Sequence, residues 1–169
     1  MRARAALGSA VFFVLAPGVV AGLIPWLLTG WHARSGPWPL RVVGLLLLVA
    51  GTGFLVTAFV RFVVEGLGTP APVAPPQNLV VGGIYRYVRN PMYLAVLACI
   101  AGQYLLLFQP VLLLDAFVTA VAVVAFVRFY EEPKLADQFG EDYAEYRRAV
   151  PGWWPRLRPY GSRTARPSR

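Results

Sequence analysis

The sequence contains very few of the side chains that bind metals or form disulfides. Among its 169 residues there is one cysteine, Cys99, and one histidine, His32. A single cysteine cannot form an intramolecular disulfide, and structural zinc sites need roughly four cysteine or histidine ligands. We therefore expect no metal site and no chemistry that depends on a nucleophilic cysteine.

Charged residues are also scarce, at 14% of the chain, whereas 57% of the residues are hydrophobic. A bilayer-spanning helix needs roughly 20 apolar residues, and four stretches approach or exceed that length: 5–28, 40–64, 92–108 and 111–130. The first is too long for a secretory signal and lacks a convincing small-residue cleavage site, so we expect it to be retained. The sequence thus predicts an all-α, polytopic membrane protein with about four transmembrane helices.

Positive charge is distributed unevenly between the two sides of such a bundle. Four helices place both termini and the middle loop on one side, which carries 14 of the 16 lysines and arginines; the other side has only Arg34 and Arg41. Positively charged flanks stay cytoplasmic, so both termini and the middle loop are predicted to be cytoplasmic. The net charge of +8 lies beside membrane ends and in the tail, which favours membrane lipids rather than nucleic acid as partners.

The remainder of the chain divides around these helices into parts of a single domain. Residues 65–82 form a Gly/Pro-rich connector between the N-terminal helix pair (1–64) and the core (83–151), and the connector either crosses a pocket or is a plain linker. Apolar residues recur every three or four positions from 135 to 150, which predicts an amphipathic helix, broken near Gly140, at the interface or over the cytoplasmic opening. Trp153 and Trp154 are candidate interfacial anchors, and residues 152–169 form a basic tail.

Two polar clusters bracket the apolar hairpin formed by the last two predicted helices. The first is residues 83–93, Gly-Ile-Tyr-Arg-Tyr-Val-Arg-Asn-Pro-Met-Tyr, and the second is Glu131-Glu132. A helical hairpin returns the chain to its starting face, so these groups should meet at one membrane surface. Opposite charges beside hydrocarbon are costly unless they bind something, which favours a zwitterionic cofactor. The simpler alternatives are that Arg86 and Arg89 are ordinary membrane-flanking charges and that the glutamates only begin the surface helix.

The clusters resemble those of a family of integral-membrane methyltransferases that includes isoprenylcysteine carboxyl methyltransferase and the phospholipid N-methyltransferases. The resemblance covers roughly residues 77–151. It rests on Gly-x-Tyr at 83–85, Arg-Asn-Pro-Met-Tyr at 89–93, Glu-Glu at 131–132 and the Leu, Phe-Gly, Tyr, Tyr and Val-Pro positions that follow, up to residue 151. Many members have histidine where Asn90 stands and glycine where Ala95 stands.

This resemblance implies a cytoplasm-facing pocket for S-adenosylmethionine that opens laterally to a lipid-like or prenylated acceptor. The positions that match cofactor-contacting segments of the family are Gln77, Asn78, Leu79, Val80, Tyr85, Asn90, Pro91, Met92, Tyr93 and Glu131, with Glu132 beside them. Physical chemistry agrees with this set: Arg89 and Asn90 offer donors for a carboxylate, the glutamates offer acceptors for an ammonium or ribose, and the tyrosines offer aromatic faces.

The predicted reaction is direct transfer of a methyl group to a carboxylate or an amine of an amphiphilic acceptor. Alignment supplies much of such catalysis. For a carboxylate acceptor, Arg89 or Arg128 would hold the carboxylate, and Arg128 resembles the family's substrate-facing arginine. An amine acceptor must first lose a proton, which gives Glu131 or Glu132 an acid–base role. The alternative is a non-enzymatic four-helix membrane protein, such as a transporter or an assembly subunit. A proton-coupled transporter should have an ionisable residue in mid-bundle, whereas here the polar residues gather at the cytoplasmic edge.

Overall fold

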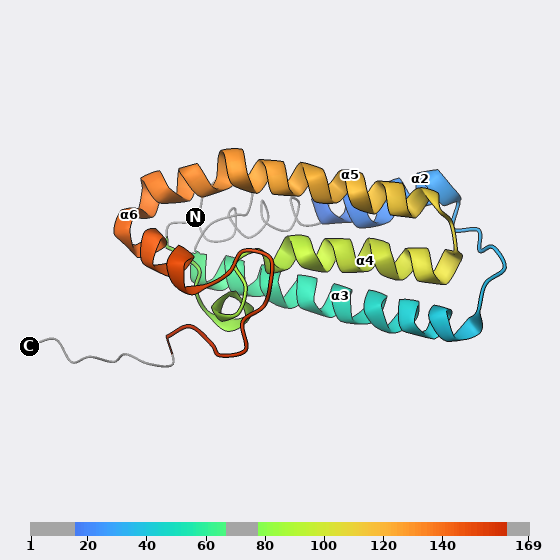
Figure 1. Cartoon of the computed structure of the whole chain (residues 1–169), viewed down its shortest axis with the longest axis horizontal. Coiled ribbons are helices and arrows are strands. Elements are labelled where there is room, and N and C mark those ends of the chain that lie inside the picture. The colour runs from blue at the N-terminus through green and yellow to red at the C-terminus, as the bar shows by residue number, and fades with distance from the viewer. Residues whose placement is uncertain (1–15, 67–77, 162–169) are drawn as a thin grey trace, which may run out of the picture.

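The computed structural model describes residues 16–66 and 78–161, and every regular element within those ranges is helical (Figure 1). Residues 1–15, 67–77 and 162–169 lie outside the described residues, and with them the predictions made for Gln77, the start of the first apolar stretch, most of the connector and the end of the basic tail. The elements follow one another as η1 (Val19–Leu23), α2 (Ile24–Thr29), α3 (Trp38–Gly66), η2 (Gly83–Arg86), α4 (Pro91–Leu107), α5 (Val111–Phe126), η3 (Val127–Glu131) and α6 (Glu132–Ala149).

The helices α2, α3, α4 and α5 run lengthwise beside one another in Figure 1. Pro91 begins α4 at a position where its missing N–H costs nothing. Phe108, in a left-handed conformation, ends the helix, and Pro110 immediately precedes α5. This short connection makes α4 and α5 an antiparallel hairpin, as the sequence predicts.

A pair of glycines brings α3 and α4 into close contact. A Cβ atom at Gly44 would lie 2.7 Å from the carbonyl oxygen of Gly102, and one at Gly102 would lie 2.8 Å from that of Gly44. Neither position therefore accepts a larger side chain without moving the helices apart. Small residues that let two backbones approach are typical of helix contacts in membranes.

Large apolar side chains cover the outer surface of these helices. Leu46 and Val49 on α3 are each 64% exposed, and Phe117 on α5 is 66% exposed. Among the described residues, two continuous helices, Trp38–Glu65 and Val111–Ala149, are long and apolar enough to cross a membrane, and Ala16–Thr29 and Pro91–Leu107 are shorter apolar helices. Helices that are apolar all round, with so little of their surface buried in the protein, are typical of a bundle surrounded by lipid.

The long helix that starts at Val111 changes geometry twice. It passes through the π-helical turn η3 and then breaks at Gly140, which has φ 51° and ψ −122°. Figure 1 shows α6 folding back at this break, at the end of the bundle where α3 ends and α4 begins. Tyr143 and Tyr146 on that half are buried, and Leu135 and Phe139 pack against them.

Candidate active site

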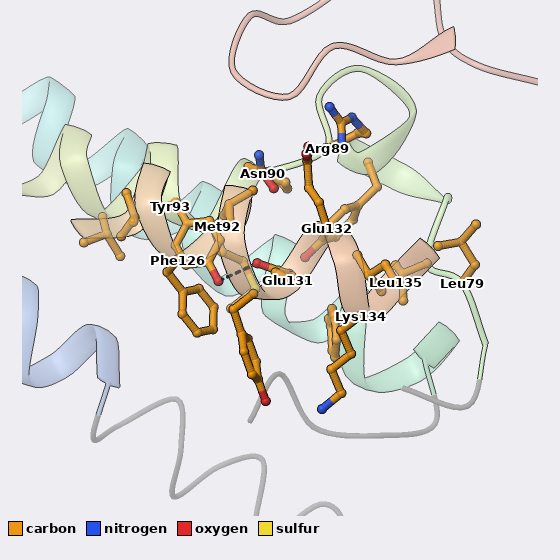
Figure 2. A pocket seen from close by; sticks show the side chains of 18 of the residues that line it. Leu79, Arg89, Asn90, Met92, Tyr93, Phe126, Glu131, Glu132, Lys134 and Leu135 are labelled. Carbon is orange, nitrogen blue, oxygen red and sulfur yellow. Dashed lines mark hydrogen bonds and ion pairs between the residues drawn. The ribbon is translucent and has the colours of Figure 1, made fainter. Parts of the chain in front are cut away.

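A cavity of about 220 Å³ lies where the loop before α4 meets η3 and α6, and most of its lining residues are drawn in Figure 2. The volume is close to the lower end for small-molecule sites, roughly 300–1,000 Å³. Ten of the residues predicted from sequence line it: Leu79, Val80, Tyr85, Arg89, Asn90, Pro91, Met92, Tyr93, Glu131 and Glu132. The fold therefore brings both polar clusters to one cavity.

The loop that carries Tyr85 is fixed from both sides. Gly83 has φ 54°, a left-handed conformation that favours glycine, and it starts the 3₁₀ turn η2. The Tyr85 hydroxyl donates a hydrogen bond to the carbonyl of Ala58 on α3 at 3.4 Å, and the Tyr146 hydroxyl donates to the carbonyl of Tyr85 at 2.7 Å. Burial, reinforced by the charge of Glu131, raises the pKa of Tyr85 far above its usual value, so its hydroxyl remains a donor at any physiological pH.

A segment after α6, residues 150–160 and here called the strap, holds the next part of the loop. The backbone N–H groups of Arg89 and Asn90 donate to the carbonyls of Pro151 and Gly152, at 2.9 and 3.2 Å. Asn90 is 8% exposed, and its amide nitrogen has no hydrogen-bond partner among the described residues. A buried donor without a partner costs about 1–3 kcal/mol, so the Asn90 amide is a donor that an additional acceptor would satisfy.

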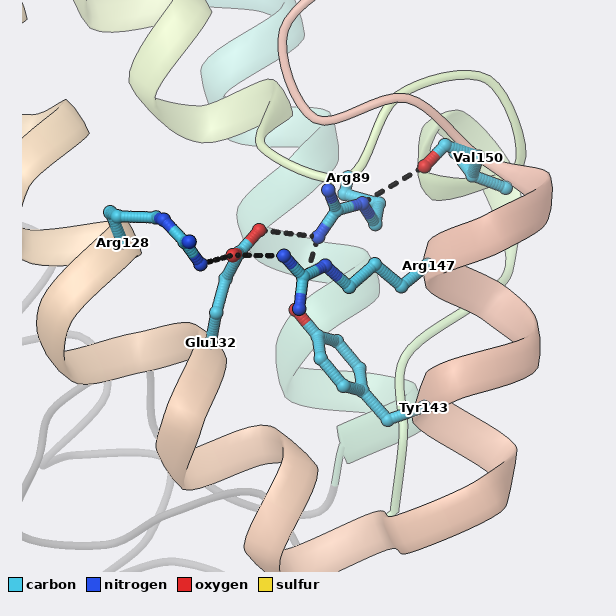
Figure 3. A network of polar contacts seen from close by, with 6 residues as sticks. All are labelled: Arg89, Arg128, Glu132, Tyr143, Arg147 and Val150. Carbon is cyan, nitrogen blue, oxygen red and sulfur yellow. Dashed lines mark hydrogen bonds and ion pairs between the residues drawn. The ribbon is translucent and has the colours of Figure 1, made fainter.

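Arg89 is tied into the protein by a network centred on Glu132 (Figure 3). Its guanidinium donates to Glu132 at 2.8 Å, to the Tyr143 hydroxyl at 3.0 Å and to the carbonyl of Val150 at 2.9 Å. Arg147 lies 3.1 Å from the other oxygen of Glu132. These contacts join the loop, both halves of α6 and the strap, which makes the pair Arg89–Glu132 the connection between the elements around the cavity.

Glu131 contacts a different partner from its neighbour. Its carboxylate accepts a hydrogen bond from the Tyr93 hydroxyl at 2.9 Å, as Figure 2 shows. Glu131 is the last residue of η3, and π-helical turns often occur at functional sites because they change which side chain faces a given direction. The Tyr93 ring also lies 6.5 Å, between centroids, from the ring of Trp153 on the strap. The cavity thus has a carboxylate, an unpaired amide and aromatic rings within one small volume.

A model of the phospholipid methyltransferase family matches residues 40–142, well over half of the chain. The chain belongs to this family. Neither a curated protein sequence nor a solved structure shows significant similarity to it. The family match confirms the resemblance seen in the sequence clusters and supports a methyltransferase function at a membrane.

Two other residues predicted from sequence, Asn78 and Arg128, do not line the cavity. Asn78 is exposed, and its side chain donates to the carbonyl of Glu65 at 3.3 Å. The Arg128 side chain is 63% exposed and lies 3.6 Å from Glu132. Glu132 lines the cavity, whereas Arg128 does not. Gln77 lies outside the described residues. Both Asn78 and Arg128 therefore contact residues near the cavity without lining it.

Sequence reasoning missed an acidic residue at the end of α3. Glu65 accepts a hydrogen bond from the N–H of Gly82 at 2.9 Å and pairs with Arg61 at 3.2 Å. Gly82 immediately precedes η2, so Glu65 positions the loop that carries Tyr85 without reaching the cavity. The only sequence signal is that an acid one turn after an arginine ends a helix, which is common on any helix surface.

An apolar limb of the cavity was also missed. Its lining includes Ala16, Pro17 and Val20 from the N-terminal segment and Val123, Phe126 and Val127 from the α5–η3 helix. The first three precede the family match and come from a region that the sequence marked only as hydrophobic. The cavity therefore extends from the polar groups into the apolar part of the bundle.

Proposed function

We propose that the protein transfers a methyl group from S-adenosylmethionine to an amphiphilic acceptor. The observation that carries this proposal is a single cavity whose polar end holds Asn90, Glu131 and Tyr93 and whose other end is apolar. Bound S-adenosylmethionine supplies an electrophilic methyl group on a sulfonium. Its carboxylate and ammonium require a donor and an anion close together, and the unpaired amide of Asn90 and the carboxylate of Glu131 meet that requirement.

In this proposal the two glutamates have separate tasks. Glu131 binds the cofactor ammonium, whereas Glu132 holds Arg89 and so keeps the loop and α6 together. Because three protein groups already bind Arg89, it positions Asn90 and does not hold an acceptor carboxylate. Arg128, exposed beside Glu132, remains the arginine available to an acceptor anion. Where the acceptor is an amine, Glu131 is the group within the cavity that can take its proton.

Binding of S-adenosylmethionine to the detergent-purified protein tests the cofactor site. Asn90→Ala and Glu131→Gln should each weaken binding by about tenfold or more, since a hydrogen bond to a charged group contributes about 1.5–3 kcal/mol. Glu141→Gln is the matched control, because Glu141 is exposed on α6 and does not line the cavity. Unchanged affinity in both site variants, measured by calorimetric titration, would contradict the proposed site.

We further propose that four helices cross the membrane, that both termini and the active site are cytoplasmic, and that α6 is an amphipathic helix lying over the cytoplasmic opening. The two long apolar helices, the two shorter ones and the 14-to-2 division of basic residues support this topology. A cysteine at Ser162 should react with a membrane-impermeant reagent only after the cells are opened. Labelling from outside intact cells would contradict the orientation.

The acceptor should enter sideways from the inner leaflet, with its chain in the apolar limb. Each additional methylene that becomes buried should improve binding by about 0.8 kcal/mol, measured as methyl transfer to matched lipid-like carboxylates and amines at fixed interfacial concentration. Val123→Phe should shorten the preferred chain because Val123 lines the limb, whereas Val121→Phe should not, because Val121 is exposed on the outer surface. A flat response to chain length would contradict lateral entry, and a preference for one headgroup would identify the chemistry.

A further inference from the structure

The strap is held firmly against the loop that precedes α4. The N–H of Arg156 donates to the carbonyl of Tyr87 at 2.9 Å, and the Arg156 guanidinium donates to the carbonyl of Ala149 at 2.6 Å. Farther along, the N–H of Tyr160 donates to the carbonyl of Arg86, whose side chain returns a bond to the carbonyl of Tyr160. Together with the hydrogen bonds that the carbonyls of Pro151 and Gly152 accept, these contacts fix the strap at its start, middle and end.

Two large apolar side chains nevertheless point away from the protein on this fixed segment. Trp154 is 80% exposed and Leu157 is 99% exposed. Because the backbone on either side of them is hydrogen-bonded to the loop, their exposure is a property of the folded strap. In Figure 1 the strap lies at the same end of the bundle as α6, beside the ends of α3 and α4.

The chemistry around these side chains fits an anionic lipid surface. After Glu145 the sequence contains no further acidic residue, whereas it contains seven arginines from Arg147 onward. Of these, Arg147, Arg148 and Arg158 are exposed in the described part of the chain. Tryptophan and leucine beside arginine are typical of segments that insert at the headgroup boundary, and each basic residue near an anionic surface adds attraction. An exposed apolar pair, followed and preceded along the chain by arginines, matches anionic phospholipid in both its hydrocarbon and its charge, although Glu145 lies beside Tyr160 at the end of the strap.

We propose that the strap is a membrane-docking element, with Trp154 and Leu157 inserted among the headgroups of anionic phospholipids. This surface is separate from the apolar limb and does not depend on the identity of the methyl acceptor. The exposed surface of the strap is also separate from the long apolar helices, because the strap is an irregular segment that is hydrogen-bonded to the loop before α4. Docking would hold the strap, and with it the backbone partners of Arg89 and Asn90, against the bilayer.

The proposal can be tested with the full chain in nanodiscs of phosphatidylcholine, with or without an equal amount of phosphatidylglycerol. A nitroxide on Leu157→Cys should be more accessible to oxygen than to a water-soluble nickel complex, and one on Glu141→Cys, on the exposed face of α6, should show the reverse. Cys99 is buried, and the labelled wild-type chain gives its background signal. Equal accessibility ratios at 157 and 141 in the anionic nanodiscs would overturn the proposal, as would spin–spin broadening that shows contact between two copies at 157.

Two further measurements separate the apolar and charged parts of the proposal. Trp154→Phe should remove the part of the tryptophan quenching by brominated phospholipids that increases when phosphatidylglycerol is added. Arg158→Gln or added salt should reduce that increase, because the attraction to headgroups is screened. Quenching that does not respond to phosphatidylglycerol, in a wild-type chain that remains folded, would overturn the preference for anionic lipid.

Discussion

Replacing Glu132 by glutamine should destabilise the protein more than any single change to its arginine partners. The side chains of Arg89 and Glu132 are only 12% and 10% exposed, and their charged atoms lie 2.8 Å apart. Glutamine leaves Arg89 buried without a counter-charge and also removes the partner of Arg128 and Arg147. Removing one partner of a buried ion pair costs about 3–5 kcal/mol. We expect Glu132→Gln to lower the free energy of unfolding by an amount in that range.

The arginine variants should follow an order set by burial and by the number of bonds lost. Arg89→Met removes the bonds to Glu132, Tyr143 and the Val150 carbonyl but leaves Glu132 with two guanidiniums, so it should cost less than Glu132→Gln. Arg147→Gln, on a side chain that is 44% exposed, should cost about 1 kcal/mol or less.

Reversible unfolding in mixed micelles measures this series, and a double-mutant cycle on Arg89 and Glu132 isolates their coupling. Glu131→Gln, which alters the neighbouring carboxylate, is the control for a change of charge at this position in the chain. If Glu132→Gln costs no more than Arg147→Gln, Glu132 does not hold the elements together and the argument from burial fails.

Three other changes test how the loop and the bundle are built. Glu65→Ala should lower stability by about 1–3 kcal/mol because the Gly82 N–H loses its partner, whereas Glu65→Gln should cost less than about 1 kcal/mol. Equal costs in thermal unfolding would contradict the role of Glu65 as the hydrogen-bond acceptor that positions the loop. Gly83→Ala should destabilise the protein by about 1 kcal/mol or more because φ is positive at that position. Its control is Gly53→Ala, in a helix with open space around the new methyl group, which should be neutral or stabilising by up to about 1 kcal/mol. Hydrogen exchange of the loop would show the difference between the two variants. Gly102→Val should separate α3 from α4 and cost several-fold more than Gly53→Val, and similar unfolding free energies for the two would exclude the close contact.

The hydrophobic pattern was sufficient to predict the helices of the hairpin. Residues 92–108 and 111–130 are close to the observed α4 and the α5–η3 helix, because apolar run length and the two prolines mark these ends. The break at Gly140 was also predicted, since glycine there interrupts an otherwise regular stripe. Both polar clusters meet at one cavity because a hairpin must return to the face it left.

The parts that sequence reasoning missed depend on how helices face one another. Val20 was part of a uniformly apolar run, and such a run does not specify which side chains line a cavity. Glu65 looked like an ordinary acid at a helix end, and its bond to Gly82 exists only because the chain returns there after the connector. The π-helical turn η3 has no local sequence signature, since it adds one residue to a turn without any special side chain.

Ordinary helix geometry explains how the two adjacent glutamates acquire different partners. Successive residues of a helix point about 100° apart, since there are 3.6 residues per turn, so side chains at 131 and 132 cannot share one direction. Glu131, at the end of η3, contacts Tyr93 of α4, while Glu132, at the start of α6, contacts Arg89 of the loop and Arg147 of α6. The charge of Glu132, which stabilises the fold, is thereby compensated by arginines, whereas Glu131 accepts its hydrogen bond from the neutral Tyr93 hydroxyl. A cationic ligand group should therefore bind at Glu131 and not at Glu132, and this is why Glu131→Gln is expected to weaken cofactor binding with little effect on stability, whereas Glu132→Gln is expected to unfold the site itself.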